Sequence, residues 1–142
     1  MEKQTKKIID WGRVWDNSTN WKGYRVLFTD HTQKFCDNFN EFNNFEQATD
    51  EEIKRFYQEE NYIFEGDIIE IIAGKKIQIG ERKKVKSFFT YTPYEAYGHH
   101  ATKYVVFTDG TKTNILNIKN INSKFNNTAK EFEHAWNLDG SL

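Results

Sequence analysis

The sequence contains very little proline and cysteine, with one residue of each, Pro93 and Cys36, among 142. A single cysteine excludes a disulfide framework within the chain, and no CxxC pair surrounds it to make the thiol reactive. We therefore interpret Cys36 as a core thiol rather than a nucleophile, in a reducing compartment. The first nine residues are charged and end in only two apolar ones, so we expect neither a signal peptide nor a membrane span. These absences predict a cytoplasmic protein.

Motifs of common enzyme classes are missing as well. The chain contains no GxxxxGK[ST], GxGxxG, HExxH or GxSxG. The adjacent His99 and His100 would point to opposite faces of an extended segment, so they can hardly chelate one ion. Asp30 and Asp109 suit hairpin turns better than a catalytic pair of carboxylates. We expect a protein that is not an enzyme, with no catalytic residue, no metal and no cofactor.

Aromatic residues, by contrast, make up 16% of the chain and suit strands and flat contact surfaces. The net charge is only −1, yet the charges are segregated. Residues 37–70 hold eleven acidic and two basic side chains, whereas residues 71–90 hold six basic and one acidic. Such asymmetry either orients a charged partner or reflects solvated surfaces.

An internal repeat is the most informative feature of the sequence. FTDHT at residues 28–32 recurs as FTDGT at residues 107–111, a shift of 79. The same shift places Val26 on Val105 and Tyr57 on Trp136. Each copy has alternating strand residues before the motif, and Asp109-Gly110 favours a tight hairpin turn. Chance similarity in an asparagine-rich chain is the alternative reading.

Two capping boxes follow the repeated strands. Thr49 with Glu52, and Thr128 with Glu131, have the spacing that satisfies free amides at the first turn of a helix. They predict short helices near residues 50–60 and 129–137. Upstream, we align residues 12–15 with residues 83–86, which requires a loop about eight residues longer in the second copy.

Residues 65–121 resemble the KOW class of SH3-like barrels, in the small form common in bacteriophage genomes. The resemblance rests on GDIIEII at residues 66–72, on three single positions, and on YVVFTDGT at residues 104–111. The single positions are Gly74, Gly80 and Val85. The resemblance implies a five-stranded, strongly bent antiparallel barrel, a fold used by ribosomal and transcription-elongation factors and by Tudor-type readers. It offers no catalytic residues, and a phage origin places the protein in the cytoplasm of a bacterial host cell.

The resulting fold expectation is mainly β (α+β), with two SH3-like antiparallel β-barrel halves from internal duplication, each followed by a short α-helix. The N-terminal half covers residues 1–60 and is a degenerate copy, and the C-terminal half covers residues 61–142. The halves should pack together, because about 60 residues bury little apolar surface on their own. Unpaired strand edges would also allow two chains to pair, so a homodimer is an alternative to a monomer.

Two binding functions fit this chain. In the first, it binds nucleic acid, because cations neutralise phosphates and aromatic rings stack on unpaired bases. The residues expected to do so are Lys75, Lys76, Arg82, Lys83, Lys84, Lys86, Tyr91, Tyr94 and Tyr97.

In the second, an acidic surface imitates DNA and blocks a host nucleic-acid-binding protein, as an anti-CRISPR-like, anti-defence inhibitor from a phage would. The residues expected to carry that contact are Asp50, Glu51, Glu52, Glu59 and Glu60.

Overall fold

The computed structural model describes residues 5–15, 21–92 and 101–132, and it divides into two compact units. The boundary lies between Phe56 and Tyr57. We call the described residues up to 56 unit 1 and residues 57–132 unit 2. Each has its own cluster of buried side chains.

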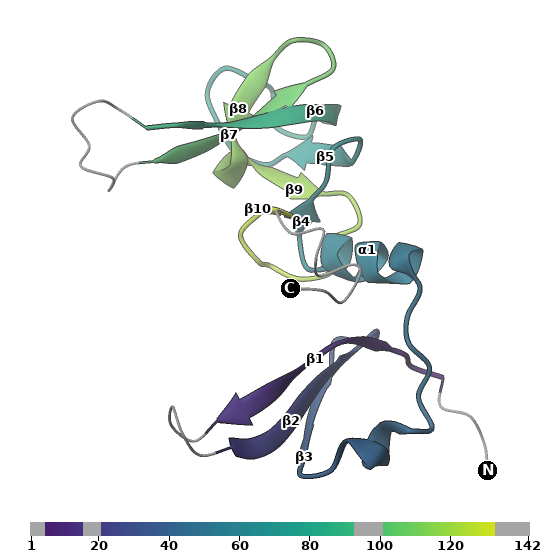
Figure 1. Cartoon of the computed structure of the whole chain (residues 1–142). Helices are drawn as coiled ribbons and strands as arrows, with labels where there is room; N and C mark the ends of the chain where they lie inside the picture. Colours follow the sequence, from purple (N-terminus) through teal and green to yellow (C-terminus); the bar gives the residue numbers. More distant parts are fainter. Residues whose placement is uncertain (1–4, 16–20, 93–100, 133–142) are drawn as a thin grey trace. The chain divides into compact units, whose positions relative to one another are not determined.

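Unit 1 is built on a three-stranded antiparallel sheet of consecutive strands (Figure 1). The strands are β1 (Ile8–Trp15), β2 (Trp21–Phe28) and β3 (Gln33–Cys36). A 3-10 turn, η1 (Phe39–Phe42), and the helix α1 (Asp50–Glu59) follow them, and the last three residues of α1 belong to unit 2. The core consists of Ile8, Val26, Phe28, Cys36 and Phe42.

Cys36 is buried in this core, as the sequence predicts. Its sulfur donates a hydrogen bond to the carbonyl of Asn38 at 3.0 Å. Burial raises the pKa of the thiol, so the side chain behaves as a small apolar residue.

Unit 2 contains an antiparallel sheet of five strands in the order β8-β7-β6-β5-β9 (Figure 1). A separate parallel pair joins β4 to β10. The elements are β4 (Tyr62–Ile63), β5 (Ile68–Ile71), β6 (Arg82–Tyr91), β7 (Thr102–Phe107), β8 (Lys112–Asn114), the 3-10 turn η2 (Ile115–Asn117), β9 (Ile118–Asn120) and β10 (Lys130–Glu131). The long β6 pairs with β5 over its first residues and with β7 over the rest, so one strand serves both parts of the sheet.

A mainly β fold with antiparallel sheets is therefore what the chain adopts. The helix predicted near residues 50–60 is confirmed as α1. Its capping box is formed, because Thr49 N–H donates to Glu52 Oε1 at 3.0 Å and Glu52 N–H donates to Thr49 Oγ1 at 3.2 Å. It is the one α-helix among the residues that the structure describes.

The expected helix start near Ala129 is wrong. Lys130 and Glu131 form β10, which lies parallel to β4. The amides of Lys130 and Phe132 donate to the carbonyls of Asn61 and Ile63 at 3.3 and 3.0 Å. The parallel pairing holds these residues in an extended conformation, and the Glu131 carboxylate, which a capping box would place on the amide of Thr128, accepts a hydrogen bond from Lys103 Nζ at 2.6 Å. Residues 133–137 lie outside the described part of the chain.

The β1–β2 pair of unit 1 and the β6–β7 pair of unit 2 share one register. Ile8 faces Phe28 as Val85 faces Phe107, and a shift in register follows directly in both pairs. Further along, Gly12 faces Arg25 where Phe89 faces Tyr104. The first strand of each pair is thus related by 77 residues, from Ile8 to Val85, and the second by 79, from Phe28 to Phe107.

This register corrects the alignment of residues 12–15 with residues 83–86. Those four residues correspond instead to the far end of β6 and the residue after it, and the counterparts of Lys83-Lys84-Val85 are Lys6-Lys7-Ile8. The second copy is longer by two residues between its paired strands rather than about eight. Matching residues 12–15 by local pattern failed because the correspondence depends on how β1 and β6 pair with the next strand, which the local sequence does not show.

The turns after β2 and β7 also match in detail. Asp30 accepts a hydrogen bond from Thr32 N–H at 3.0 Å, and Asp109 accepts one from Thr111 N–H at 2.9 Å. His31 has a φ of 68° where Gly110 has 87°. The histidine tolerates this left-handed conformation in a turn whose hydrogen bonds are otherwise the same, and its ring stacks on Phe56 at 4.3 Å.

The two units differ in what surrounds this shared hairpin. In unit 2 the amide and carbonyl of Val85 bond to Asp67 O and Gly66 N at 2.9 and 2.8 Å, just before β5. In unit 1 the amide and carbonyl of Ile8 bond to Glu46 O and Ala48 N, both at 2.8 Å. Within its described residues, unit 1 has no strand in the place of β5 or β9.

Candidate nucleic-acid interface

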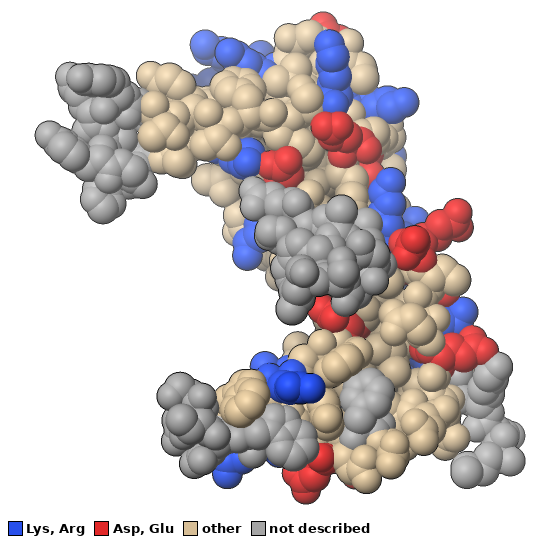
Figure 2. All heavy atoms as spheres, in the orientation of Figure 1, with Lys and Arg blue, Asp and Glu red and all other residues tan. Residues whose placement is uncertain are grey.

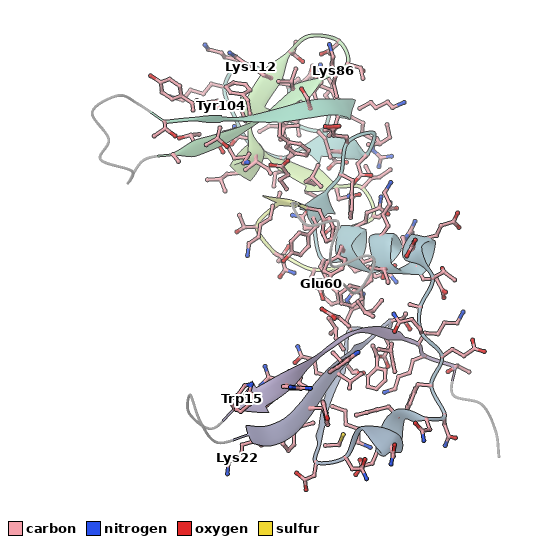
Figure 3. The ribbon with its side chains drawn as sticks, in the orientation of Figure 1. Trp15, Lys22, Glu60, Lys86, Tyr104 and Lys112 are labelled. Atoms are coloured by element: carbon pink, nitrogen blue, oxygen red, sulfur yellow. The ribbon has the colours of Figure 1, made fainter. Side chains whose placement is uncertain are left out.

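An exposed surface of aromatic rings and a lysine crosses strands β6, β7 and β8. We call it the β6–β8 face, consisting of Phe89, Tyr91, Tyr104 and Lys112. Phe89 and Tyr104 face each other in register, and their rings stack at 5.1 Å between centroids with 14° between planes. Lys112 Nζ lies 5.3 Å from the Phe89 centroid. Figure 3 labels Tyr104 and Lys112 on neighbouring strands.

Strand alternation explains why these rings are outside the core. Val105 and Phe107 of β7 are buried. Tyr104 directly precedes Val105 on the same strand, so its side chain points to the opposite side of the sheet. On β6, Phe88 packs against the core cluster while Phe89 is 37% exposed. One of these two adjacent phenylalanines thus packs on the core and the other lies on the surface.

Most of the predicted cations lie on the surface of the same unit. Lys75 and Lys76 are exposed in the connection between β5 and β6, and Lys84 and Lys86 are exposed on β6. Arg82 is exposed too, with its Nε 3.6 Å from a carboxylate oxygen of Glu70 on the facing strand. Figure 2 shows Lys and Arg side chains gathered over the part of unit 2 that holds β5, β6 and β8.

Lys83 is different from the other cations. Its side chain is only 9% exposed, because it shares the inner side of β6 with Val85. The ammonium pairs with Asp109, lies 3.3 Å from Glu81 and sits 5.8 Å from the Phe107 centroid. The hydrogen bond to Asp109 raises the pKa of Lys83 and lowers that of Asp109. Since this ammonium is already engaged, we do not include Lys83 in the β6–β8 face.

Of the three predicted tyrosines, Tyr91 lies on the β6–β8 face and is 54% exposed. Tyr94 and Tyr97 lie outside the described residues. The sequence prediction omits Phe89, Tyr104 and Lys112. Alternation along residues 104–107 could have placed Tyr104 on the surface, but its pairing with Phe89 depends on the register of two strands that lie ten residues apart in the sequence.

The acidic residues of the alternative hypothesis mostly stabilise their own units. Glu52 closes the capping box and accepts a hydrogen bond from Lys7 Nζ at 3.0 Å. The amide of Thr49 and then Lys7 hold the pKa of Glu52 below its usual value. Glu59 is 9% exposed and lies 3.1 Å from Lys124, and Glu60 accepts from Asn127 Nδ2 at 3.0 Å.

The other two acidic residues, Asp50 and Glu51, are exposed in the first turn of α1. There they favour the helix through its dipole.

In the part of the chain that the structure describes, no group of three or more His, Cys, Asp and Glu side chains could hold a metal ion. His99 and His100 lie outside that part. The described residues also contain no helix with the length and apolar character needed to cross a membrane. Comparison with known proteins gives no match to a family model, to a curated protein or to a solved structure.

Proposed function

We propose that this chain is a non-enzymatic binding protein for single-stranded nucleic acid, with the β6–β8 face of unit 2 as its contact surface. The stack of Phe89 on Tyr104, with Lys112 over the phenyl ring, is the observation that carries the proposal. Proteins that bind single strands combine exposed aromatic rings, on which bases stack, with cations that follow the phosphates. Lys84 and Lys86 supply further exposed cations on β6.

The strand order of unit 2 supports an SH3-like fold as part of this proposal. An order of β8-β7-β6-β5-β9, all antiparallel, with a 3-10 turn before the last strand, is what a five-stranded barrel of the KOW class would have. The shared register of β1–β2 and β6–β7 supports an origin of unit 1 by duplication of the same hairpin. Fold alone does not fix a ligand, so the function rests on the β6–β8 face.

The test is binding of a labelled single-stranded oligonucleotide, followed by fluorescence anisotropy at several salt concentrations. Lys86→Glu and Lys112→Glu should each weaken binding and reduce the salt dependence by more than one released counterion. Tyr104→Ala should weaken binding with little change in that slope, because a ring binds a base and not a phosphate. Lys130→Glu changes the net charge equally on β10, which does not pair with β6, β7 or β8, and is the matched control.

The proposal is wrong if the Lys86, Lys112 and Tyr104 variants bind like Lys130→Glu. Capture of a basic protein from nuclease-treated lysate, lost in Glu51→Lys and kept in Lys86→Glu, would favour the inhibitor hypothesis instead.

A further inference from the structure

A second row of aromatic and basic side chains lies on the β1–β2 hairpin of unit 1. Trp11, Arg13 and Trp15 are two residues apart on β1, so they share one side of the sheet. Tyr24 faces Arg13 in register, and its ring meets Trp11 edge-on at 5.8 Å between centroids. Trp11 is 48% exposed and Trp15 49%. We call these four residues the tryptophan row.

Comparison with unit 2 explains why these rings are exposed. The counterpart of Trp11 at a shift of 77 is Phe88, which packs against a core that includes Ile69 and Ile71 of β5 and Ile118 of β9. Unit 1 has no strand in those places among its described residues. The side of the hairpin that strands cover in unit 2 therefore carries the half-exposed indole of Trp11 in unit 1, and Trp15 corresponds to Thr92, which is exposed just after the end of β6.

The charges of the hairpin indicate which ligand suits this row. Among the charged residues of strands β1–β3, Arg13 and Lys34 lie on the side of the row, whereas Arg25 and Asp10 lie on the opposite side. The Asp10 carboxylate accepts a hydrogen bond from Trp11 N–H at 2.8 Å. Lys22 is exposed at the same end of the hairpin as Trp15 (Figure 3).

We propose that the tryptophan row is a second binding site for single-stranded nucleic acid, in which bases stack on Trp11 and Trp15 and Arg13 meets a phosphate between them. Two residues along a strand span about 6.6 Å, so the two indoles stand about 13 Å apart, with the guanidinium midway. Indole rings and a planar guanidinium both stack on bases, and the guanidinium also binds phosphate. A proline-rich peptide would use the aromatic rings but not the excess of cations.

The opposite side of the same sheet provides a matched control. Phe35 is 49% exposed, as Trp15 is, but it pairs with Arg25 and lies on the other side. Its ring lies over Gly23, with Cζ 3.0 Å from the place of a β-carbon there. Phe35→Ala thus removes an equally exposed aromatic ring without touching the tryptophan row.

The experiment is a titration of the full chain with unlabelled oligothymidylate, with intrinsic tryptophan fluorescence and calorimetry as readouts. No tryptophan lies between residues 22 and 135, so the β6–β8 face does not itself report in this signal. We expect quenching on binding. We also expect a loss of affinity of about tenfold for each of Trp11→Ala and Trp15→Ala, and no change for Phe35→Ala. Arg13→Glu retains both tryptophans and should weaken binding with a smaller salt dependence. This variant tests the tryptophan row even if Trp11→Ala or Trp15→Ala fails to fold.

This inference shares its ligand class with the proposed function, and the variants separate the two. If the affinity measured by calorimetry responds to Lys86→Glu and Lys112→Glu but not to Trp11→Ala, Trp15→Ala or Arg13→Glu, and the oligonucleotide does not quench the tryptophans, the tryptophan row is not a site and the β6–β8 face stands. The reverse pattern removes the β6–β8 face and keeps the row. Quenching by a proline-rich peptide but not by the oligonucleotide would overturn the inference.

Discussion

Lys83 and Asp109 form an ion pair that ties the first residues of β6 to the turn between β7 and β8. Unit 1 contains its counterpart, because Lys6 Nζ lies 3.8 Å from Asp30 and 4.3 Å from the centroid of Phe28. The same three residue types, lysine, aspartate and phenylalanine, recur at shifts of 77 and 79 residues, as the strands do. The pair is thus a repeated structural device of the hairpin.

Acid should weaken the contribution of Asp109. Its folded-state pKa lies below the ordinary value, with the hydrogen bond from Lys83 as the main cause, so its stabilisation is present above about pH 4 and is lost as the pH falls further. Asp109→Asn keeps an acceptor for Thr111 but loses the charge. The difference in free energy of unfolding between the two proteins should be constant from about pH 5 to 7 and shrink below about pH 4. Urea titrations at each pH measure it, and a difference that does not change with pH would contradict the assignment.

The two lysines of the repeated device should contribute unequally. Lys83 is 9% exposed and Lys6 32%, so water screens the pair of Lys6 with Asp30 more strongly. Lys83→Met should therefore destabilise the protein more than Lys6→Met, which should cost no more than about 1 kcal/mol. Double-mutant cycles with Asp109→Asn and Asp30→Asn isolate each coupling. Equal couplings in 0.15 M and 1 M salt would argue against screening as the cause.

Two glycines of the same sheet should respond in opposite ways to alanine. Gly23 has a φ of +146°, and a β-carbon there would collide with the carbonyl oxygen of Cys36. Gly12 has nothing within 4 Å of that position. Gly23→Ala should lower the free energy of unfolding by more than about 1 kcal/mol, while Gly12→Ala should leave it unchanged or raise it by up to about 1 kcal/mol. Thermal and urea unfolding of both variants give the comparison, and a tolerated Gly23→Ala would mean that the strand can shift.

Asn120 should be the most sensitive polar residue of unit 2. It is fully buried and donates through Nδ2 to Asp67 at 2.8 Å and to the carbonyl of Tyr62 at 3.0 Å, and its N–H donates to Asn61 Oδ1 at 2.8 Å. Asn120→Ala leaves a buried carboxylate short of one donor and should cost about 2–4 kcal/mol. Lys119→Ala, on the exposed side of the same strand, should change stability by at most about 0.5 kcal/mol.

A second substitution at this position separates the polar network from simple packing. Asn120→Asp preserves volume but places two carboxyl groups together, so its destabilisation should decrease as the pH falls and one of them takes up a proton. An effect that is the same at pH 5 and pH 8 would indicate that shape and not charge matters there.

Much of the candidate interface follows from local sequence, and its decisive contacts do not. The cluster of lysines is visible in residues 71–90, and the alternation in residues 104–107 marks Tyr104 as a surface residue. Two facts are not local. Lys83 is held in an ion pair by Asp109, 26 residues away, and Phe89 stacks on Tyr104 because of the register of β6 and β7. The sequence did not predict the tryptophan row for the same reason, because the exposure of Trp11 depends on strands that unit 2 has and the described part of unit 1 lacks.

The sequence by itself determined the mainly β character, the helix capped by Thr49 and Glu52, the repeated Asp–Thr turns and the burial of Cys36. Each of these depends on hydrogen bonds or side-chain alternation among residues close together in the chain. Tertiary structure alone decided that β1 corresponds to β6 at a shift of 77, and that Lys130 and Glu131 form a strand. In both cases the backbone amides bond to acceptors on a strand that is distant in the sequence, so the local sequence does not determine the pairing. Thr128 and Glu131 have the spacing of a helix cap, but the carbonyls of Asn61 and Ile63 accept bonds from Lys130 and Phe132, and Glu131 pairs with Lys103.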